Sequence, residues 1–320
     1  SITAPNGSIY YTTSGIDPRQ PVTGNPSSGS ILYTGSFALP GPAIVKARAR
    51  LSDGTWSALV EAEFEPGGVI SQFKPGISSG WNFDDNWTNP PYPDSTAARA
   101  RIMAPTSGDR NIDLTSPVTV REITFEQGST SFRNRIRDEI GANPLSFGSA
   151  TGSAVVRVNG TGSGWAEFEL GSECNLNSPL TLEVNNTAGN TEYGALRLRG
   201  IWMGTEGLTK TGPGIASLTG EGKLYSGPTV ISQGVLKISQ AAAMNWSSSV
   251  SVTPGGQLRL SSGGTASEPE IYSFGGPLHL DSSGRSGVTA GPGAGVEGGL
   301  RYEPGSGANH AALYNAVALD

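Results

Sequence analysis

The chain has 320 residues, of which 46 are glycine, and only 15% of its residues are charged. Average proteins contain about 7% glycine and about 25% charged residues, and helical bundles and coiled coils need many charged helix formers, so those classes are excluded. Collagen is excluded because glycine does not recur at every third position. No run of about 18 apolar residues occurs, so no membrane-spanning segment is predicted. The composition favours an all-β chain with many turns.

The formal net charge of −6 argues against nucleic acid as a partner, because nucleic-acid-binding domains normally carry a basic surface. The single cysteine, Cys174, excludes an internal disulfide and a cysteine-based metal site. We expect this side chain to pack in the core. Because the chain begins at Ser1 rather than at methionine, we expect a processed or partial product.

Residues 1–66 are predicted to form a small β domain. Ile9–Thr13 is rich in aromatic and β-branched residues, which favour strands. Ile44–Arg50 alternates apolar and charged residues, so one face of this strand is buried and the other is solvated. Pro66-Gly67-Gly68 then interrupts the pattern and marks a boundary.

A family resemblance adds to this prediction. It rests on two stretches, TAPNGSIYYTTSGIDPR (Thr3–Arg19) and VKARARLSDGTWSALVEAEF (Val45–Phe64). They resemble the immunoglobulin-like domain at the C-terminus of bacterial chitobiases and hexosaminidases, which is also widespread in large bacterial surface proteins. The resemblance implies a small Ig-like β-sandwich without catalytic residues, which acts as an accessory or spacing domain.

Residues 67–109 are interpreted as a linker followed by an aromatic segment. Trp81, Phe83 and Trp87 lie close together here, beside the adjacent carboxylates Asp84 and Asp85. An aromatic cluster at the start of a solenoid is suited to cover its otherwise open first coil. We therefore expect a cap at this position.

Residues 110–320 contain a weak repeat, with a glycine-rich part near the end. Its unit is an apolar–polar–apolar tripeptide, whose two apolar side chains are expected to point inward. Most start-to-start spacings lie between 20 and 23 residues, which suits one coil of a parallel β-helix, and two are 14. The shorter steps represent either neighbouring strands of one coil or an irregular coil. The tripeptides are Ile123–Phe125, Leu145–Phe147, Phe168–Leu170, Leu182–Val184, Leu196–Leu198, Ala216–Leu218, Leu236–Ile238, Leu258–Leu260 and Leu278–Leu280.

A second resemblance appears within this repeat. The stretch GLTKTGPGIASLTGEGKLYSGPTVISQGVLKIS (Gly207–Ser239) resembles the repeat of bacterial autotransporter passenger domains. It implies a right-handed parallel β-helix, that is, a solenoid, in a bacterial protein that is secreted or held at the cell surface. The two resemblances together predict an all-β chain in which a small Ig-like β-sandwich precedes a right-handed parallel β-helix.

Five side chains are candidates for contact with a glycan. Trp81 and Trp87 offer rings that stack on sugars. Arg133, Arg135 and Arg137 alternate along a predicted strand and would form a cationic row on one face. Such a row suits acidic sugars, although it could equally pair with the nearby carboxylates. Those carboxylates belong to Asp138 and Glu139.

No catalytic, cofactor-binding or metal-binding residues are predicted. The two histidines, His279 and His310, show no metal-ligand spacing. Asp84 and Asp85 point to opposite faces of a strand, so they do not form the carboxylate pair of a glycosidase. Asp109, Asp113 and Asp281 lack the tandem Gly-Gly-x-Gly-x-Asp turns of calcium-binding β-helices.

We therefore expect a non-catalytic extracellular structural protein, either a stalk or a subunit of a self-assembling filament or surface layer. Open coil ends favour stacking with another chain, so self-association is the first expected partnership. The alternative is an adhesin that binds extracellular polysaccharide. A polysaccharide lyase or hydrolase is the least favoured alternative, because no cluster of catalytic residues is evident.

Overall fold

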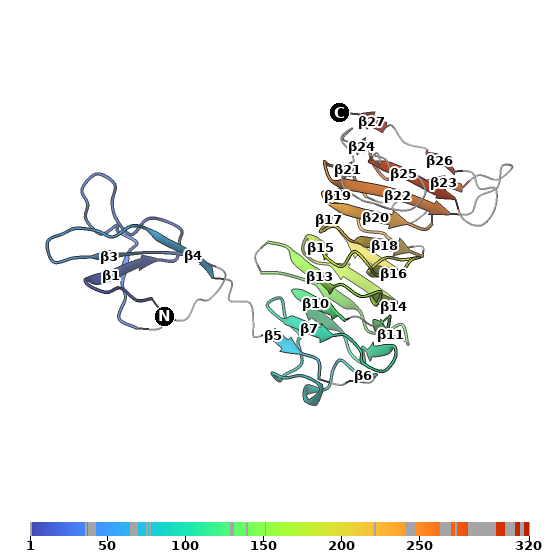
Figure 1. The fold of residues 1–320 in the computed structure, drawn as a ribbon, viewed down its shortest axis with the longest axis horizontal. Coiled ribbons are helices and arrows are strands. Elements are labelled where there is room, and N and C mark those ends of the chain that lie inside the picture. Colours follow the sequence, from blue (N-terminus) through green and yellow to red (C-terminus); the bar gives the residue numbers. More distant parts are fainter. Residues whose placement is uncertain are drawn as a thin grey trace. The chain divides into compact units, whose positions relative to one another are not determined.

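The computed structural model describes residues 2–35, 37, 43–64, 70–74, 76, 78–128, 131–138, 140–150, 152–220, 222–240, 247–262, 270–272, 274–280, 299–304, 311–313 and 317–319. The chain divides into two compact units, Ser1–Gly68 and Val69–Asp320. Nearly all of their regular structure is β, and the helical content among the described residues is one 3₁₀ helix, η1 (Asp84–Asn86) (Figure 1). The prediction of an all-β chain is confirmed.

The first unit contains a four-stranded antiparallel sheet in the order β2-β1-β3-β4. Its strands are β1 (Ser8–Thr12), β2 (Ile31–Leu32), β3 (Ala43–Arg50) and β4 (Val60–Phe64). Tyr11, Val45 and Ala47 form the small buried core, and the rings of Tyr11 and Phe37 stack at 4.2 Å. The described residues of this unit form one sheet, and the Ig-like sandwich stays a prediction.

The second unit is built from two long parallel sheets. The ten-stranded sheet begins at β5 and the eleven-stranded sheet at β6, and every strand pair in both is parallel. We call them the first and the second sheet. The first sheet contains, in order, β5 (Ile70–Gln72), β7 (Arg99–Met103), β10 (Glu122–Gln127), β13 (Ala154–Gly160), β15 (Leu180–Val184), β17 (Leu208–Thr211), β19 (Thr229–Ile231), β21 (Val250–Val252), β24 (Leu278–Leu280) and β27 (Val317–Leu319).

The second sheet follows the same direction along the stack. Its path is β6 (Ser79–Gly80), β8 (Arg110–Asp113), β11 (Arg133–Asp138), β14 (Trp165–Leu176), β16 (Leu196–Gly204), β18 (Ile215–Thr219), β20 (Gly234–Ile238), β22 (Gly256–Ser262) and β25 (Leu300–Pro304). Two further strands, β9 (Val118–Val120) and β12 (Leu145–Phe147), complete this sheet. β12 pairs with the C-terminal part of β14, and β9 pairs with β12. A separate two-stranded ladder joins β23 (Glu270–Tyr272) and β26 (Ala311–Leu313).

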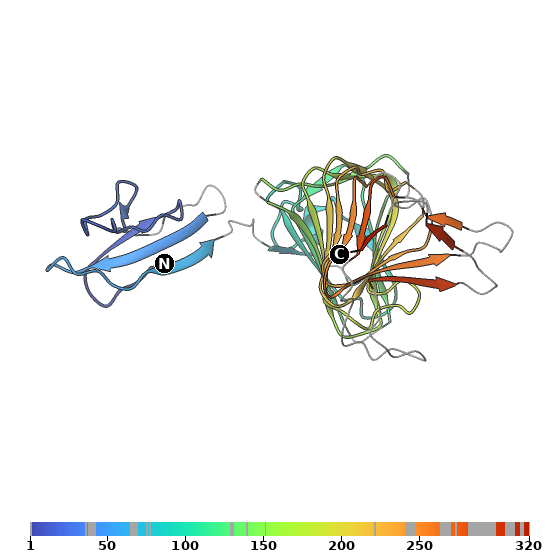
Figure 2. The same cartoon turned by 90° about the horizontal axis from the view of Figure 1, so that it is seen from above.

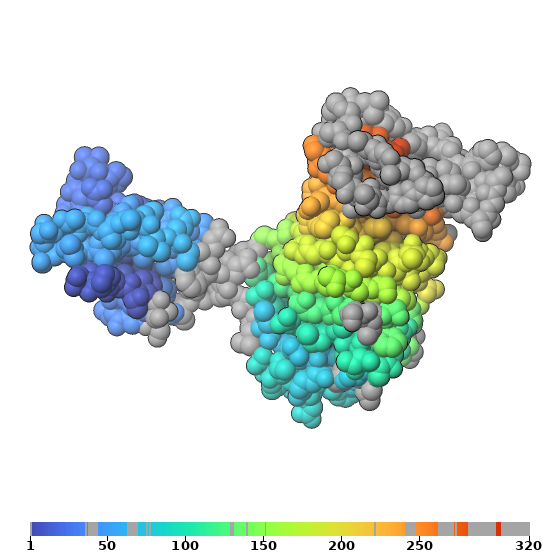
Figure 3. Space-filling model, viewed as in Figure 1, coloured from blue at the N-terminus to red at the C-terminus, as the bar shows by residue number. Residues whose placement is uncertain are grey.

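The chain visits the two sheets in alternation, so consecutive passes stack as coils. Seen along the stack, strands of successive coils lie over one another (Figure 2), and the space-filling view shows the coils as successive bands of colour (Figure 3). Coil length varies, because Thr209, Val230 and Ser251 are register partners 21 residues apart, whereas Glu122 and Val155 are 33 apart. The strands keep register while the connecting segments absorb the difference.

The nine repeat tripeptides all lie in strands, and their flanking apolar residues are buried. The two 14-residue steps, from Phe168 to Leu182 and on to Leu196, cross between the sheets, so they join neighbouring strands of one coil. One expectation was wrong. The 22-residue step from Ile123 to Leu145 and the 20-residue step from Leu258 to Leu278 also cross between the sheets, because spacing does not separate a full coil from a long connection.

The core lies between the sheets. Phe168 makes edge contacts with Phe125, Phe147 and Trp202 at 5.8–5.9 Å between ring centroids. The rings of Phe147 and Trp202 stack at 6.0 Å. These aromatic side chains are fully buried, and each removes a large apolar area from water.

Glycines form the corner of the second sheet at which β14 turns from its pairing with β11 to its pairing with β12, and β16 turns with it. The register of these strands shifts between Glu169 and Glu173. A Cβ atom on Gly171 would lie 2.8 Å from the carbonyl oxygen of Asp138. Gly200 has φ +98°, and a Cβ there would lie 2.5 Å from the carbonyl oxygen of Leu170. The corner therefore requires residues without a side chain, both for backbone conformation and for close approach of the coils.

Candidate functional site

The two tryptophans of the predicted glycan site are buried. Trp81 and Trp87 have 0% and 1% of their surface exposed. Their indole N–H groups donate to the carbonyl oxygens of Pro93 at 3.0 Å and of Trp81 at 2.7 Å. Their rings meet edge to face at 4.6 Å, and Phe73 packs against Trp87. Neither ring presents a face to solvent on which a sugar could stack.

The three arginines of the predicted row lie on the outer face of β11. Register pairing places Arg135 between Asn111 and Glu167, and Arg137 between Asp113 and Glu169. One coil further, Arg197 follows Glu167 and Arg199 follows Glu169. Along the ladder from Asp113 to Arg199 the charge therefore changes sign at each coil, the arrangement that stabilises directly opposed strands.

We call the network of ion pairs on this face the ion-paired lattice. Its members are Asp113, Arg133, Arg135, Arg137, Glu167, Glu169, Arg197 and Arg199. Glu167 lies at its centre. Its side chain is 1% exposed, and its carboxylate oxygens lie 2.7 Å from Nη1 of Arg133 and 3.0 Å from Nη1 of Arg197. Nε of Arg135 lies 3.5 Å away. One buried carboxylate thus joins cations from β11 and β16, and the charge-assisted bonds compensate for its burial.

The partners expected from sequence proximity were partly wrong. Arg133 also pairs with Asp109 at 3.1 Å, Arg135 pairs with Glu169 at 2.6 Å, and Arg137 pairs with Asp113. These carboxylates lie on neighbouring coils. Asp138 alternates to the buried side of β11 and accepts the backbone N–H of Asn143 at 2.9 Å. Glu139 lies outside the described residues.

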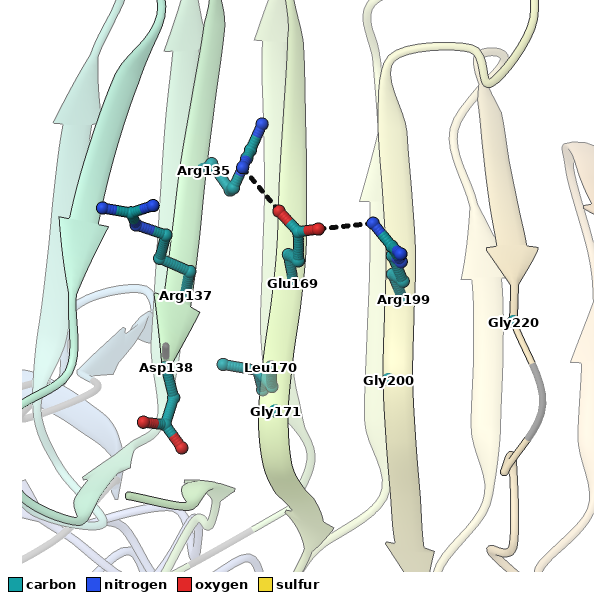
Figure 4. Close-up of a pocket in the computed structure, with 9 residues that line it drawn as sticks. All are labelled: Arg135, Arg137, Asp138, Glu169, Leu170, Gly171, Arg199, Gly200 and Gly220. Carbon is teal, nitrogen blue, oxygen red and sulfur yellow. Dashed lines mark hydrogen bonds and ion pairs between the residues drawn. The ribbon is translucent and has the colours of Figure 1, made fainter. Parts of the chain in front are cut away.

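A groove of about 530 Å³ runs along the glycine corner beside the lattice. Gly171, Gly200 and Gly220 leave it open because they have no side chains, and Arg135, Arg137 and Arg199 line its side. In Figure 4, Glu169 lies between Arg135 and Arg199 and pairs with both. The guanidinium groups at this groove are thus engaged by carboxylates of the protein itself.

The first sheet repeats the same design. Glu122 pairs with Arg99 at 3.0 Å and with Arg157 at 2.9 Å, and Arg157 also pairs with Glu183 at 2.9 Å. Burial raises the pKa of the Glu122 carboxyl, but the hydrogen bond from Arg99 and the charges of Arg99 and Arg157 outweigh burial. The net pKa lies below the ordinary value, so the carboxylate form is favoured.

Two buried lysines were missed in the sequence analysis. Nζ of Lys210, which is 0% exposed, donates to the carbonyl oxygens of Thr211 at 2.6 Å and Gly212 at 2.7 Å. Nζ of Lys223 donates to those of Gly200 at 2.8 Å and Thr219 at 3.0 Å. Both ammonium groups tie backbone segments together at the corners of coils.

Lys223 lies two coils along the stack from the buried cysteine. Cys174 is the register partner of Trp202 on the next coil, and Trp202 is in turn the partner of Lys223 on the coil after that. Burial lowers the pKa of Lys223 to about 7 and raises the pKa of the Cys174 thiol well above its ordinary value. Cys174 is fully buried, as expected for a core residue.

Among the described residues, no group of three His, Cys, Asp or Glu side chains is placed to hold a metal ion. His279 lies on the outer face of β24. Asp84 is occupied in accepting the backbone N–H of Tyr92 at 2.8 Å. His310 and Asp281 lie outside the described residues. In the described part of the chain we also find no helix long and apolar enough to span a bilayer.

Comparison with known families finds two matches. Residues 208–238 match the Passenger-associated-transport-repeat family, and residues 1–64 match the Fn3 associated family. The repeat match covers β17–β20 and includes both buried lysines. It supports autotransporter-type repeats, and the other match is consistent with an Ig-like domain. The repeat suggests a secreted or surface protein of the autotransporter type. No curated protein and no solved structure matches the chain.

Proposed function

We propose that the second unit is a right-handed parallel β-helix that serves as a non-catalytic structural stalk on the outside of a bacterial cell. The first unit, as an Ig-like sandwich, acts as its spacing domain. The alternation between two parallel sheets supports this assignment of the second unit, and so does the passenger-associated repeat. The aromatic segment around Trp81 and Trp87 serves as the cap of the first coil.

The ion-paired lattice is the observation that carries the proposal. Its arginines and carboxylates come from different coils, and each charge is engaged by an opposite charge on a neighbour. An active site keeps charged groups open toward a substrate. Here the charged side chains connect neighbouring coils to one another, and a structural element needs such connections along its length.

The proposal is tested by negative-stain electron microscopy of the full chain. A stalk requires single particles in which the second unit is a rod of constant width. A filament or surface-layer subunit would instead give fibres or a lattice that grow with protein concentration. A second unit without a columnar shape would overturn the structural assignment.

Cell-surface location needs a separate experiment. An antibody against the second unit should label intact cells of the source organism without permeabilisation. Labelling that appears only after the cells are opened would contradict an extracellular stalk.

The alternatives from the sequence are less well supported. An adhesin that uses Trp81 and Trp87 conflicts with their burial, and Arg133, Arg135 and Arg137 are engaged in ion pairs. A lyase or hydrolase would need converging groups open to substrate, and we do not propose one.

A further inference from the structure

The first unit contains a polar pocket of about 440 Å³ with an unusual charge balance. Three arginines from different parts of the unit line it: Arg19 follows β1, and Arg48 and Arg50 lie two residues apart on one face of β3. The lining also includes Thr23, Asn25 and Thr55. This volume falls within the range of about 300–1,000 Å³ that is typical of small-molecule pockets.

Hydrogen bonds fix the walls of this pocket. Nε1 of Trp56 donates to the carbonyl oxygen of Gly24 at 2.7 Å, which holds the loop after Arg19 against the sheet. Arg48 binds Asp17 with two hydrogen bonds of 2.8 and 2.7 Å and donates to the carbonyl oxygen of Ser57 at 2.6 Å. The backbone N–H of Arg19 donates to the same Asp17 carboxylate at 2.9 Å.

Two of the three guanidinium groups lack an acidic partner. Among the described residues, the side chains of Arg19 and Arg50 form no hydrogen bond and no ion pair. Arg50 lies over the ring of Trp56 at 5.5 Å, and its Nε is buried without a hydrogen-bond partner. Asp17, whose carboxylate accepts the backbone N–H of Arg19, is already engaged by Arg48. This differs from the ion-paired lattice, where carboxylates engage the arginines.

We propose that this pocket binds an oxyanion group of an acidic polysaccharide. A guanidinium group presents parallel N–H donors that match the oxygens of a carboxylate or a sulfate. The hydroxyl groups of Thr23 and Thr55 and the amide of Asn25 supply hydrogen bonds for sugar hydroxyls. The net charge of −6 repels polyanions in general, so the attraction is confined to this pocket.

This inference goes beyond the structural function, because it gives the first unit an attachment site of its own. It does not depend on the stalk proposal. Binding is measured with soluble polymers, whereas the stalk is tested by electron microscopy, so failure of one leaves the other standing.

The test measures binding of the full chain to immobilised polygalacturonate, dextran sulfate and neutral dextran by biolayer interferometry. We expect binding to at least one acidic polymer, weakening as salt increases, and none to dextran. Preference for polygalacturonate assigns the oxyanion to a carboxylate, and preference for dextran sulfate assigns it to a sulfate. Binding to neutral dextran at equal strength, or to double-stranded DNA as tightly as to the acidic glycans, would overturn the proposal.

Variants locate the site. R19Q and R50Q should each raise the half-saturating polymer concentration about tenfold, because each removes a charge-assisted hydrogen-bond donor. K46Q removes the same charge from β3 outside the pocket and should leave binding unchanged. Arg19 has an exposed side chain without protein partners, so R19Q keeps the test valid if R50Q fails to fold. Unchanged binding by R19Q with intact thermal unfolding would refute the site.

Discussion

Glu167 Oε2 lies 2.7 Å from Nη1 of Arg133 although the two residues are 34 positions apart in the chain. The glutamate is buried, while the guanidinium carbon of the arginine lies over the ring of Trp165, 5.5 Å from its centroid. A buried carboxylate that joins cations from two coils makes the stability of each coil depend on its neighbours. Substitutions in the ion-paired lattice therefore test how much the ion pairs between coils contribute to the stability of the stack.

The E167Q variant should lower the free energy of unfolding by about 3 kcal/mol, because it leaves partly buried guanidinium groups without their buried carboxylate. E126Q is the matched control. Its pair with Arg101, at 3.1 Å, is partly exposed, so the loss should be less than about 1 kcal/mol. Both losses are measured by urea unfolding, and equal losses would contradict the central position of Glu167.

Acid should weaken the first sheet through Glu122. Its pKa is lower in the folded chain than its ordinary value of 4.5, so the unfolded chain binds this proton more readily. The stability that Glu122 contributes is complete above pH 4.5 and is lost as the pH falls through the folded value. Urea unfolding between pH 3 and 6 should show a steeper loss for the wild type than for E122Q. Parallel curves would show that the ion pairs of Glu122 contribute nothing.

Lys223 should produce a dependence of the same sign near neutral pH. Its pKa of about 7 in the folded chain lies below the ordinary 10.5. Between these values the unfolded chain holds a proton that the folded chain has released, so the free energy of unfolding rises with pH. K223M should flatten this rise between pH 7 and 10, whereas K74M, which alters an exposed lysine, should retain it. An unchanged slope in K223M would exclude Lys223 as its source.

Two glycine-to-alanine variants can separate the cost of a steric clash between coils from the cost of a left-handed backbone conformation. G200A adds a Cβ that would lie 2.5 Å from a backbone oxygen at φ +98°, whereas G152A at φ +74° meets nothing within 4 Å. G152A should cost about 1 kcal/mol, the penalty of a left-handed conformation, and G200A about 3 kcal/mol or more. Similar losses in urea unfolding would mean that the coils can separate at this corner.

The aromatic segment should stabilise the start of the stack. W87A removes a fully buried ring and should lower stability by about 3 kcal/mol or more. F83A removes a side chain that is 55% exposed and should cost less than about 0.5 kcal/mol. Differential scanning calorimetry distinguishes the two, and an equal effect would contradict a cap formed by Trp87.

The strands of the second unit were predictable because inward and outward positions alternate. Leu196–Leu198 and Leu236–Ile238 show this pattern in the sequence and are strands in the structure. The same rule could have identified Lys210, which occupies an inward position within Leu208–Thr211. A lysine at an apolar position of a repeat is therefore a signal that the sequence alone contains.

Partners across coils were not predictable. Which carboxylate faces Arg133 depends on the length of each connection, and coil length varies without a sequence marker. The pocket of the first unit was not predictable for a similar reason. Arg19 and Arg50 are 31 residues apart in the sequence, and only the fold brings them to the same pocket. The aromatic residues of 81–87 were recognised as a cluster, but composition does not tell which ring faces are covered.

The stacked sheets also determine how far the second unit can extend for each residue it uses. Neighbouring strands are about 4.8 Å apart, so a coil of 21 residues, such as Thr209 to Val230, advances the column by about 4.8 Å. The same residues in an α-helix would span about 32 Å. A chain that needed only length would use the helix. This architecture uses its residues for width and for contacts between layers, which the proposed stalk would need in order to resist bending and proteolysis.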